Sequence, residues 1–151
     1  MSEGELKIRV ILADDHPVVR DGLAAIVNQQ ADMEVVAEAG DGEEAITLYE
    51  RHRPDVMVLD LRMPKLDGVA VVQRVLEAHP KACLLIMTTY DGHEDIFRSL
   101  SQGAKGYLLK DAPRQEILSA VRAVAADRPY TSSSVAAKAV RLGLLSDDQA
   151  R

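Results

Sequence analysis

Five residues whose side chains suit phosphate or metal chemistry stand at the ends of short apolar segments. Asp14 and Asp15 follow the first of these segments, and Asp60 ends the third. Thr88 ends the fourth segment, and Lys110 ends the fifth. Polar residues often follow strands, so each of them alone has an ordinary structural explanation. Four segment ends with matching chemistry make a shared site the better interpretation.

These side chains complement one another if they meet in one crevice. Three carboxylates in one place repel each other, and a hard divalent cation such as Mg²⁺, which prefers oxygen ligands, removes that conflict. The Lys110 ammonium can meet one phosphoryl oxygen, and the Thr88 hydroxyl can donate to another. A carboxylate nucleophile with a metal, an ammonium and a hydroxyl suits phosphoryl transfer, in which catalysis is mainly positioning and charge neutralisation.

The elements that must hold these residues alternate along the chain. Short aliphatic segments, often β-branched, are typical of strands buried on both faces of a parallel sheet. Amphipathic stretches with apolar residues at helical spacing lie between them. The pattern predicts an α/β domain with five helices and a doubly wound parallel sheet of five strands in the order 2-1-3-4-5, in which ligands bind at the carboxyl ends of the strands. The expected strands are residues 8–13, 34–39 (an edge strand), 55–59, 83–87 and 107–109.

The domain predicted from this alternation covers residues 1–127, and residues 128–151 have a different character. Residues 130–134 have the sequence YTSSS, which is typical of a linker and a helix cap. Residues 134–142 place apolar side chains on one face of a short amphipathic helix. We expect this segment to connect the domain to a further, effector domain.

The composition limits the classes of protein to which the chain can belong. Its net charge is −6 over 151 residues, which argues against direct binding to a nucleic acid backbone. Cys83 is the single cysteine, so an internal disulfide and a cysteine cluster for zinc are excluded, and we expect an inert core thiol. The four histidines lack the spacing of a metal site. No apolar stretch predicts a signal peptide or a membrane span, which favours a cytoplasmic location.

The sequence, with these residues in place, resembles the receiver domain of bacterial two-component response regulators, a flavodoxin-like fold, over residues 6–127. The strongest match is DLRMPKLDG at residues 60–68, a phosphoacceptor followed by a Met-Pro turn and an Asp-Gly helix start. Residues 12–23 and 106–112, LADDHPVVRDGL and GYLLKDA, are similar to the NarL/LuxR type. That type normally carries a C-terminal helix-turn-helix domain that binds DNA, and this sequence stops where such a domain is expected to begin.

The resemblance implies how the acidic residues work. A sensor histidine kinase presents a phosphohistidine, and Asp60 attacks its phosphorus. Mg²⁺ is held by Asp15, Asp60 and the backbone carbonyl of Arg62, and Asp14 orients a bound water. Arg62 and Tyr90 each lie two residues past a site residue, so we expect their side chains to limit the attack of water on the phosphoryl group.

The resemblance also implies a switch. Lys110 and Thr88 contact the new phosphoryl group, and Tyr107 changes rotamer as Thr88 moves. The sequence departs from many receivers at Asp111, where those proteins have a proline, often after a cis peptide bond. A cis bond costs several kcal/mol before a residue other than proline, so the resemblance leaves the geometry of the Lys110–Asp111 bond open.

Three functions from different classes are compatible with a fold of this kind. The first is a phosphorylation switch of a transcription factor, which forms a homodimer on phosphorylation and reaches DNA only through a domain beyond this sequence. The second is a stand-alone receiver that relays phosphate or docks on a protein. The third is an enzyme, but an aspartyl-phosphate hydrolase needs a DxD pattern where residues 60–62 are Asp-Leu-Arg, and flavin-binding loops are lacking. We therefore expect a signalling protein that catalyses only its own phosphorylation and dephosphorylation.

Overall fold

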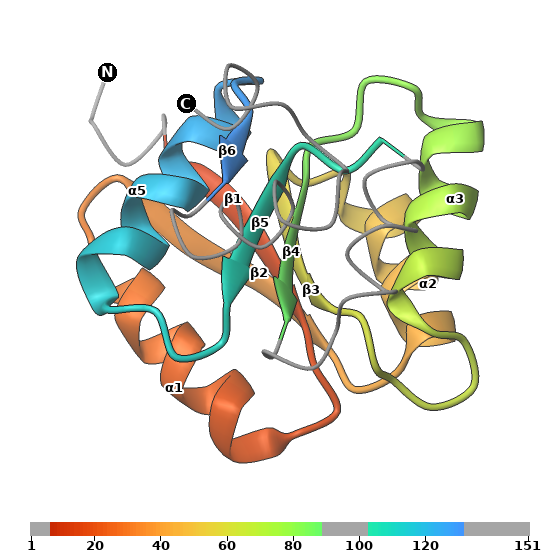
Figure 1. The fold of residues 1–151 in the computed structure, drawn as a ribbon, viewed down its shortest axis with the longest axis horizontal. Coiled ribbons are helices and arrows are strands. Elements are labelled where there is room, and N and C mark those ends of the chain that lie inside the picture. The colour runs from red at the N-terminus through yellow and green to blue at the C-terminus, as the bar shows by residue number, and fades with distance from the viewer. Residues whose placement is uncertain (1–6, 89–102, 132–151) are drawn as a thin grey trace, which may run out of the picture.

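A parallel sheet with helices on both faces forms the centre of the computed structural model, which describes residues 7–88 and 103–131 (Figure 1). Its six strands lie in the order β2-β1-β3-β4-β5-β6, and each neighbouring pair is parallel. Four helices lie within the described residues. The elements are β1 (Ile8–Ala13), α1 (Pro17–Asn28), β2 (Met33–Ala39), α2 (Gly42–His52), β3 (Val56–Asp60), α3 (Gly68–Ala78), β4 (Leu84–Thr88), β5 (Gly106–Leu109), α5 (Arg114–Ala125) and β6 (Tyr130–Thr131).

The central strands are buried because helices cover them from both sides. α2 and α3 lie on one face of the sheet, and α1 and α5 lie on the other (Figure 1). Alternate residues of a strand point to opposite faces, so Ile11 packs in the cluster with α2 and α3, whereas Val10 packs in the cluster with α1 and α5. All residues of β3 and β5 are buried. This is the burial that continuous aliphatic segments predict.

The strand order places a crevice beside β1 and β3. β1 pairs with β2 on one side and with β3 on the other, so the chain winds in opposite directions from this point. Ligands of doubly wound sheets bind at the carboxyl ends of such strands. Asp14 follows β1 and Asp60 ends β3, so the fold brings the acidic residues to this crevice.

The predicted parallel sheet and its order are confirmed, but the number of strands is corrected. Tyr130 and Thr131, predicted as part of a linker, form β6 beside Gly106 and Tyr107 of β5. The Tyr130 amide donates to the Lys105 carbonyl. Pairing satisfies main-chain groups that β5 otherwise leaves open at the sheet edge. The predicted fourth core helix and the C-terminal helix fall in residues 89–102 and 132–151, outside the described residues.

The predicted core position of Cys83 is wrong. β4 begins one residue later, at Leu84, and Cys83 is partly exposed. It lines a hollow at the amino ends of the strands, together with Tyr49 and His79. Ala82, on the preceding position, is buried, whereas Cys83 only packs partly against the core, so an apolar neighbourhood in the sequence did not mean full burial here.

Candidate functional site

Asp60 is the central carboxylate of the site. It is the last residue of β3 and only 5% of it is exposed. Its side chain accepts hydrogen bonds from the Lys110 ammonium at 2.8 Å and from the Arg62 amide at 3.2 Å. Burial raises the pKa of Asp60, and the opposing bonds from Lys110 and Arg62 do not fully offset this rise. The carboxylate is therefore held by donors in a poorly solvated position.

The turn between β1 and α1 supplies two more carboxylates. Asp14 is 3% exposed, and its side chain accepts from the His16 amide at 2.8 Å. Asp15 Oδ1 is buried and has no hydrogen-bond partner among the described residues. A buried carboxylate oxygen without a donor is costly. Asp15 Oδ1 therefore lacks a hydrogen-bond donor beside two other acidic groups.

Lys110 links the end of β5 to the acidic residues. It follows β5, and its ammonium lies 2.8 Å from Asp60 Oδ2 and 3.1 Å from Asp14 Oδ2. Burial lowers the pKa of Lys110, but the hydrogen bonds and charges of Asp60 and Asp14 outweigh it, so the pKa is raised. The ammonium stays charged and neutralises part of the acidic cluster. The sequence prediction that Asp14, Asp60 and Lys110 meet at one edge agrees with this geometry.

The donor set fits a hard divalent cation. One ligand atom from each of Asp14, Asp15, His16 and Asp60 can be chosen so that all four lie within 4.8 Å of one another. Among the described residues, the Lys110 ammonium contacts two of the three carboxylates, which leaves net negative charge in a partly buried place. The Asp15 Oδ1 atom, which accepts no hydrogen bond from the described residues, adds a second reason for a cation. Oxygen ligands of this kind are those that Mg²⁺ prefers.

His16 is a member of this cluster that the sequence did not predict. Its Nδ1 lies 3.0 Å from Asp14 Oδ1 and 3.0 Å from Asp15 Oδ1, and only the contact with Asp14 has hydrogen-bond geometry. The ring is mostly exposed, at 61% of the side chain. A neighbouring position in the sequence was its only signal, since no metal-binding spacing includes it.

The loop after β3 shapes the space beside the carboxylates. A hollow of about 570 Å³ is lined by Asp15, Leu61, Arg62, Met63, Pro64 and Asp67. Asp67 caps α3 by accepting from the Ala70 amide at 2.9 Å. A Cβ added at Gly68 would lie 2.5 Å from the Asp60 carbonyl oxygen and 2.6 Å from Leu61 Cα. Glycine at this position therefore allows α3 to start directly against the strand end that carries Asp60.

The remaining predicted site residues are only partly placed. Thr88 ends β4 and pairs with Leu109 of β5; its side chain, like Thr89 and Tyr90, is outside the described parts of the chain. Tyr107 is 2% exposed, and its hydroxyl donates to the Ala104 carbonyl at 3.3 Å. Burial raises the pKa of Tyr107. The predicted contact between Tyr107 and a moving Thr88 thus stays a prediction.

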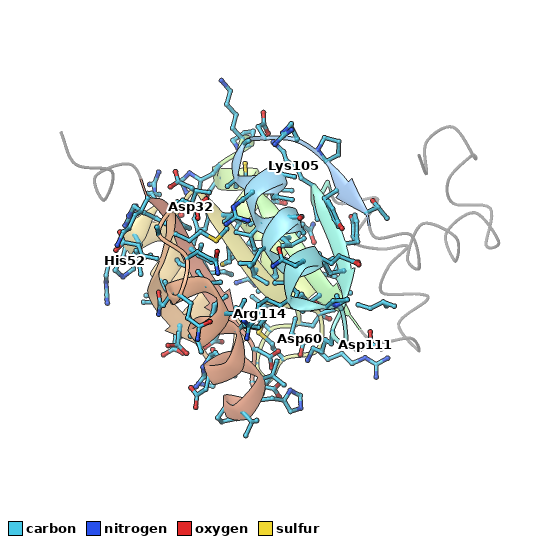
Figure 2. The ribbon with its side chains drawn as sticks, turned by 90° about the vertical axis from the view of Figure 1, so that its left-hand side faces the viewer. Asp32, His52, Asp60, Lys105, Asp111 and Arg114 are labelled. Carbon is cyan, nitrogen blue, oxygen red and sulfur yellow. The ribbon has the colours of Figure 1, made fainter. Side chains whose placement is uncertain are left out.

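The Lys110–Asp111 bond, which the sequence left open, is trans, since the described residues contain no cis peptide bond. The Ala112 amide then donates to the Leu109 carbonyl at 3.1 Å, closing a turn before α5. Figure 2 shows that Asp111 and Arg114 lie at the same end of the sheet as Asp60, whereas Asp32 and Lys105 lie at the other end. The turn therefore directs the chain back over the sheet immediately beside the site.

A doubly wound parallel sheet with three carboxylates and a lysine at its switch point defines the class of phosphoacceptor signalling domains. Residues 10–122 match the response regulator receiver domain family. The chain belongs to this family. It is a receiver domain of the NarL/LuxR type, as the sequence resemblance indicated.

Two similar proteins carry the names of transcriptional or regulatory proteins. The chain is 41% identical over 134 residues to the uncharacterized transcriptional regulatory protein YxjL of Bacillus subtilis, covering 89% of this chain and 62% of YxjL. It is 46% identical over 118 residues to the oxygen regulatory protein NreC of Staphylococcus carnosus, covering 78% of this chain and 54% of NreC. The chain thus spans little more than half the length of these relatives.

A solved structure shares the fold closely. The crystal structure of a LuxR-family two-component response regulator from Aurantimonas matches with a TM-score of 0.85 and 31% identity, over 92% of this chain and 99% of that one. Within the described residues, no helix has the length and apolar character needed to cross a membrane.

Proposed function

We propose that Asp60 accepts a phosphoryl group from a phosphohistidine of a sensor histidine kinase. The observation that carries this proposal is the position of Lys110, which contacts Asp60 and Asp14 together while the neighbouring Asp15 oxygen has no donor among the described residues. A structural ion pair needs only one carboxylate. An ammonium shared between two carboxylates, beside a third whose Oδ1 accepts no hydrogen bond from the described residues, suits a site that receives a phosphoryl group and a cation.

The transfer replaces one bond to phosphorus by another. A carboxylate oxygen of Asp60 forms the new P–O bond as the P–N bond of the phosphohistidine breaks, and the imidazole nitrogen keeps the electron pair of that bond. The product is an acyl phosphate on β3. Lys110 neutralises charge on the phosphoryl oxygens and keeps Asp60 ionised despite its burial.

Mg²⁺ is the cation that the donor set fits. Asp15, Asp60 and the backbone carbonyl of Arg62 would hold it, and Asp14 would orient a bound water. The bound ion supplies charge neutralisation between the carboxylates and the phosphoryl oxygens. Arg62 borders the hollow beside Asp15, which supports its place at this site and its proposed effect on phosphate lifetime.

The response to phosphorylation passes through neighbouring strands. Thr88 of β4 and Lys110 after β5 are proposed to contact the phosphoryl group, and Tyr107 is proposed to change position with Thr88. The pairing of Ile86 with Tyr107 and of Thr88 with Leu109 supports this link, because it places the proposed switch residues on adjacent strands. A phosphoryl group shifts a population only through contacts that differ between two states.

The output of the switch is proposed to lie outside this chain. Phosphorylation favours a homodimer, and a helix-turn-helix domain beyond these residues binds DNA in the cytoplasm. The greater length of YxjL and NreC and their regulatory names support this arrangement. The net charge of −6 does not favour DNA binding by the receiver domain itself.

Intact-mass measurement after incubation with acetyl phosphate and Mg²⁺ tests the proposal. Wild type should gain the mass of one phosphoryl group, and Asp60→Asn or excess chelator should prevent the gain. Asp21→Asn is the matched control, because Asp21 is exposed on α1 and its loss changes the net charge equally. Labelling that persists in Asp60→Asn would contradict the assignment.

A further inference from the structure

Arg20 reaches from the first turn of α1 back to the turn that carries the acidic pair. Its Nη1 donates to the main-chain carbonyl oxygen of Asp14 at 2.7 Å. Its Nε lies 3.3 Å from Glu38 Oε1 on β2. The Arg20 side chain is only 22% exposed. One guanidinium therefore joins three segments: the β1–α1 turn, α1 itself and the edge strand.

Hydrogen bonds hold the peptide groups on both sides of Asp14. The Asp14 amide donates to the Ala39 carbonyl at the end of β2, at 3.0 Å. The Asp14 carbonyl accepts from Arg20. That carbonyl belongs to the planar peptide group that joins Asp14 to Asp15, so its orientation sets the direction in which the Asp15 main chain continues.

The guanidinium lies in a place with little spare room. A Cβ at Gly40 would lie 3.2 Å from Arg20 Nη1, tighter than an ordinary contact. The Gly40 amide is itself held by Glu44 Oε1 at 2.7 Å. Hydrogen bonds from a charged donor are stronger than neutral ones, and the planar fork of arginine gives them direction. Arg20 is thus fixed by its surroundings and can fix Asp14 in turn.

We propose that Arg20 is a positioning residue for the cation site: by holding the Asp14 carbonyl, it directs the Asp15 carboxylate toward the Mg²⁺ ion. This inference rests on the proposed function. Arg20 contacts no reacting atom, so it acts through Asp15. Partners that orient metal ligands in this way typically contribute about 10- to 100-fold to metal affinity.

Titration calorimetry of Mg²⁺ binding to the unphosphorylated protein tests the proposal. Arg20→Met, which removes the donors and keeps most of the length, should weaken Mg²⁺ binding about tenfold. Arg20→Lys keeps the charge and one directed donor, so it should recover part of the affinity. Arg51→Met is the matched control, since Arg51 is exposed on α2 and its loss removes the same charge without touching the turn; its affinity should equal that of wild type.

Amide spectra of the same proteins separate positioning from loss of fold. In Arg20→Met, the amide signals of Asp15 and His16 should shift before any metal is added, while those of α5 should stay as in wild type. If Arg20→Met does not fold, Arg20→Lys decides the matter alone by its Mg²⁺ affinity. The inference is overturned if Arg20→Met binds Mg²⁺ with wild-type affinity, or if Arg20→Lys does so when only that variant folds. It is also overturned if Arg51→Met weakens Mg²⁺ binding as much as Arg20→Met does. Absence of Mg²⁺ binding in the wild type would instead refute the proposed function.

Discussion

Replacing Lys110 by methionine should destabilise the protein at neutral pH, and part of the lost stability should return in acid. The change removes an ammonium 2.8 Å from Asp60 and 3.1 Å from Asp14 and leaves two buried carboxylates facing each other. Coulomb's law gives a pair at such a distance about 6 kcal/mol at an effective dielectric constant of about 20. Desolvation of the ammonium cancels a large share of this, so we expect a loss of about 3 kcal/mol in the free energy of unfolding without metal.

The dependence on pH follows from the pKa of Asp60. Burial already raises that pKa, and Lys110 opposes the rise, so Lys110→Met raises it further. A carboxyl whose folded pKa lies above its unfolded value destabilises the fold at pH above the folded pKa, and the penalty shrinks as pH falls toward the unfolded value. The difference in stability between Lys110→Met and wild type should therefore be largest at neutral pH and narrow toward about pH 4.

Urea denaturation across this pH range, in chelator, measures the difference. Lys81→Met is the control, because Lys81 is exposed at the opposite end of the sheet; its stability should stay near that of wild type at every pH. A deficit for Lys110→Met that stayed constant between neutral pH and about pH 4 would refute the reasoning, since protonation of Asp60 must then be unrelated to it.

Three further changes test other parts of the site. Gly68→Ala, whose added carbon meets the Asp60 carbonyl at 2.5 Å, should cost about 1–3 kcal/mol in urea denaturation and slow labelling by acetyl phosphate; unchanged labelling would contradict the close fit. Mg²⁺ should raise the melting temperature of wild type by mass action and raise that of Asp15→Asn much less, and an equal rise would remove Asp15 from the site. Thr88→Ala should accept phosphate but lose the phosphorylation-induced amide shifts beyond the site; a wild-type set of shifts would disprove the proposed switch.

The sequence predicted the meeting of Lys110 with Asp14 and Asp60 better than it predicted the edges of the sheet. Continuous aliphatic segments identify buried parallel strands, and the carboxyl ends of parallel strands share one edge. The meeting of Lys110 with Asp60, fifty positions earlier, follows from these two rules alone. Strand β6 could not be predicted in this way, because Tyr130 and Thr131 are held by main-chain pairing, which leaves no pattern in two residues.

Contacts that depend on the path of a turn also could not be predicted from the sequence. Arg20 and His16 stand within six positions of Asp14, but only the bend between β1 and α1 brings the Arg20 guanidinium onto the Asp14 carbonyl. Cys83 shows the opposite case, in which an apolar neighbourhood suggested a buried thiol and the end of the strand left it partly exposed. Such features depend on the last residue of an element, where sequence patterns are weakest.

The sixth strand has a consequence for whatever is joined to this domain. Because β6 runs parallel to β5, the chain at Thr131 is heading toward the end of the sheet that carries Lys110 and Asp60. Any segment that follows would thus start from a strand that is hydrogen-bonded directly to β5. Extra residues inserted before Tyr130 would only enlarge the turn between α5 and β6. Residues inserted after Thr131 would instead lengthen the connection between β6 and whatever follows it.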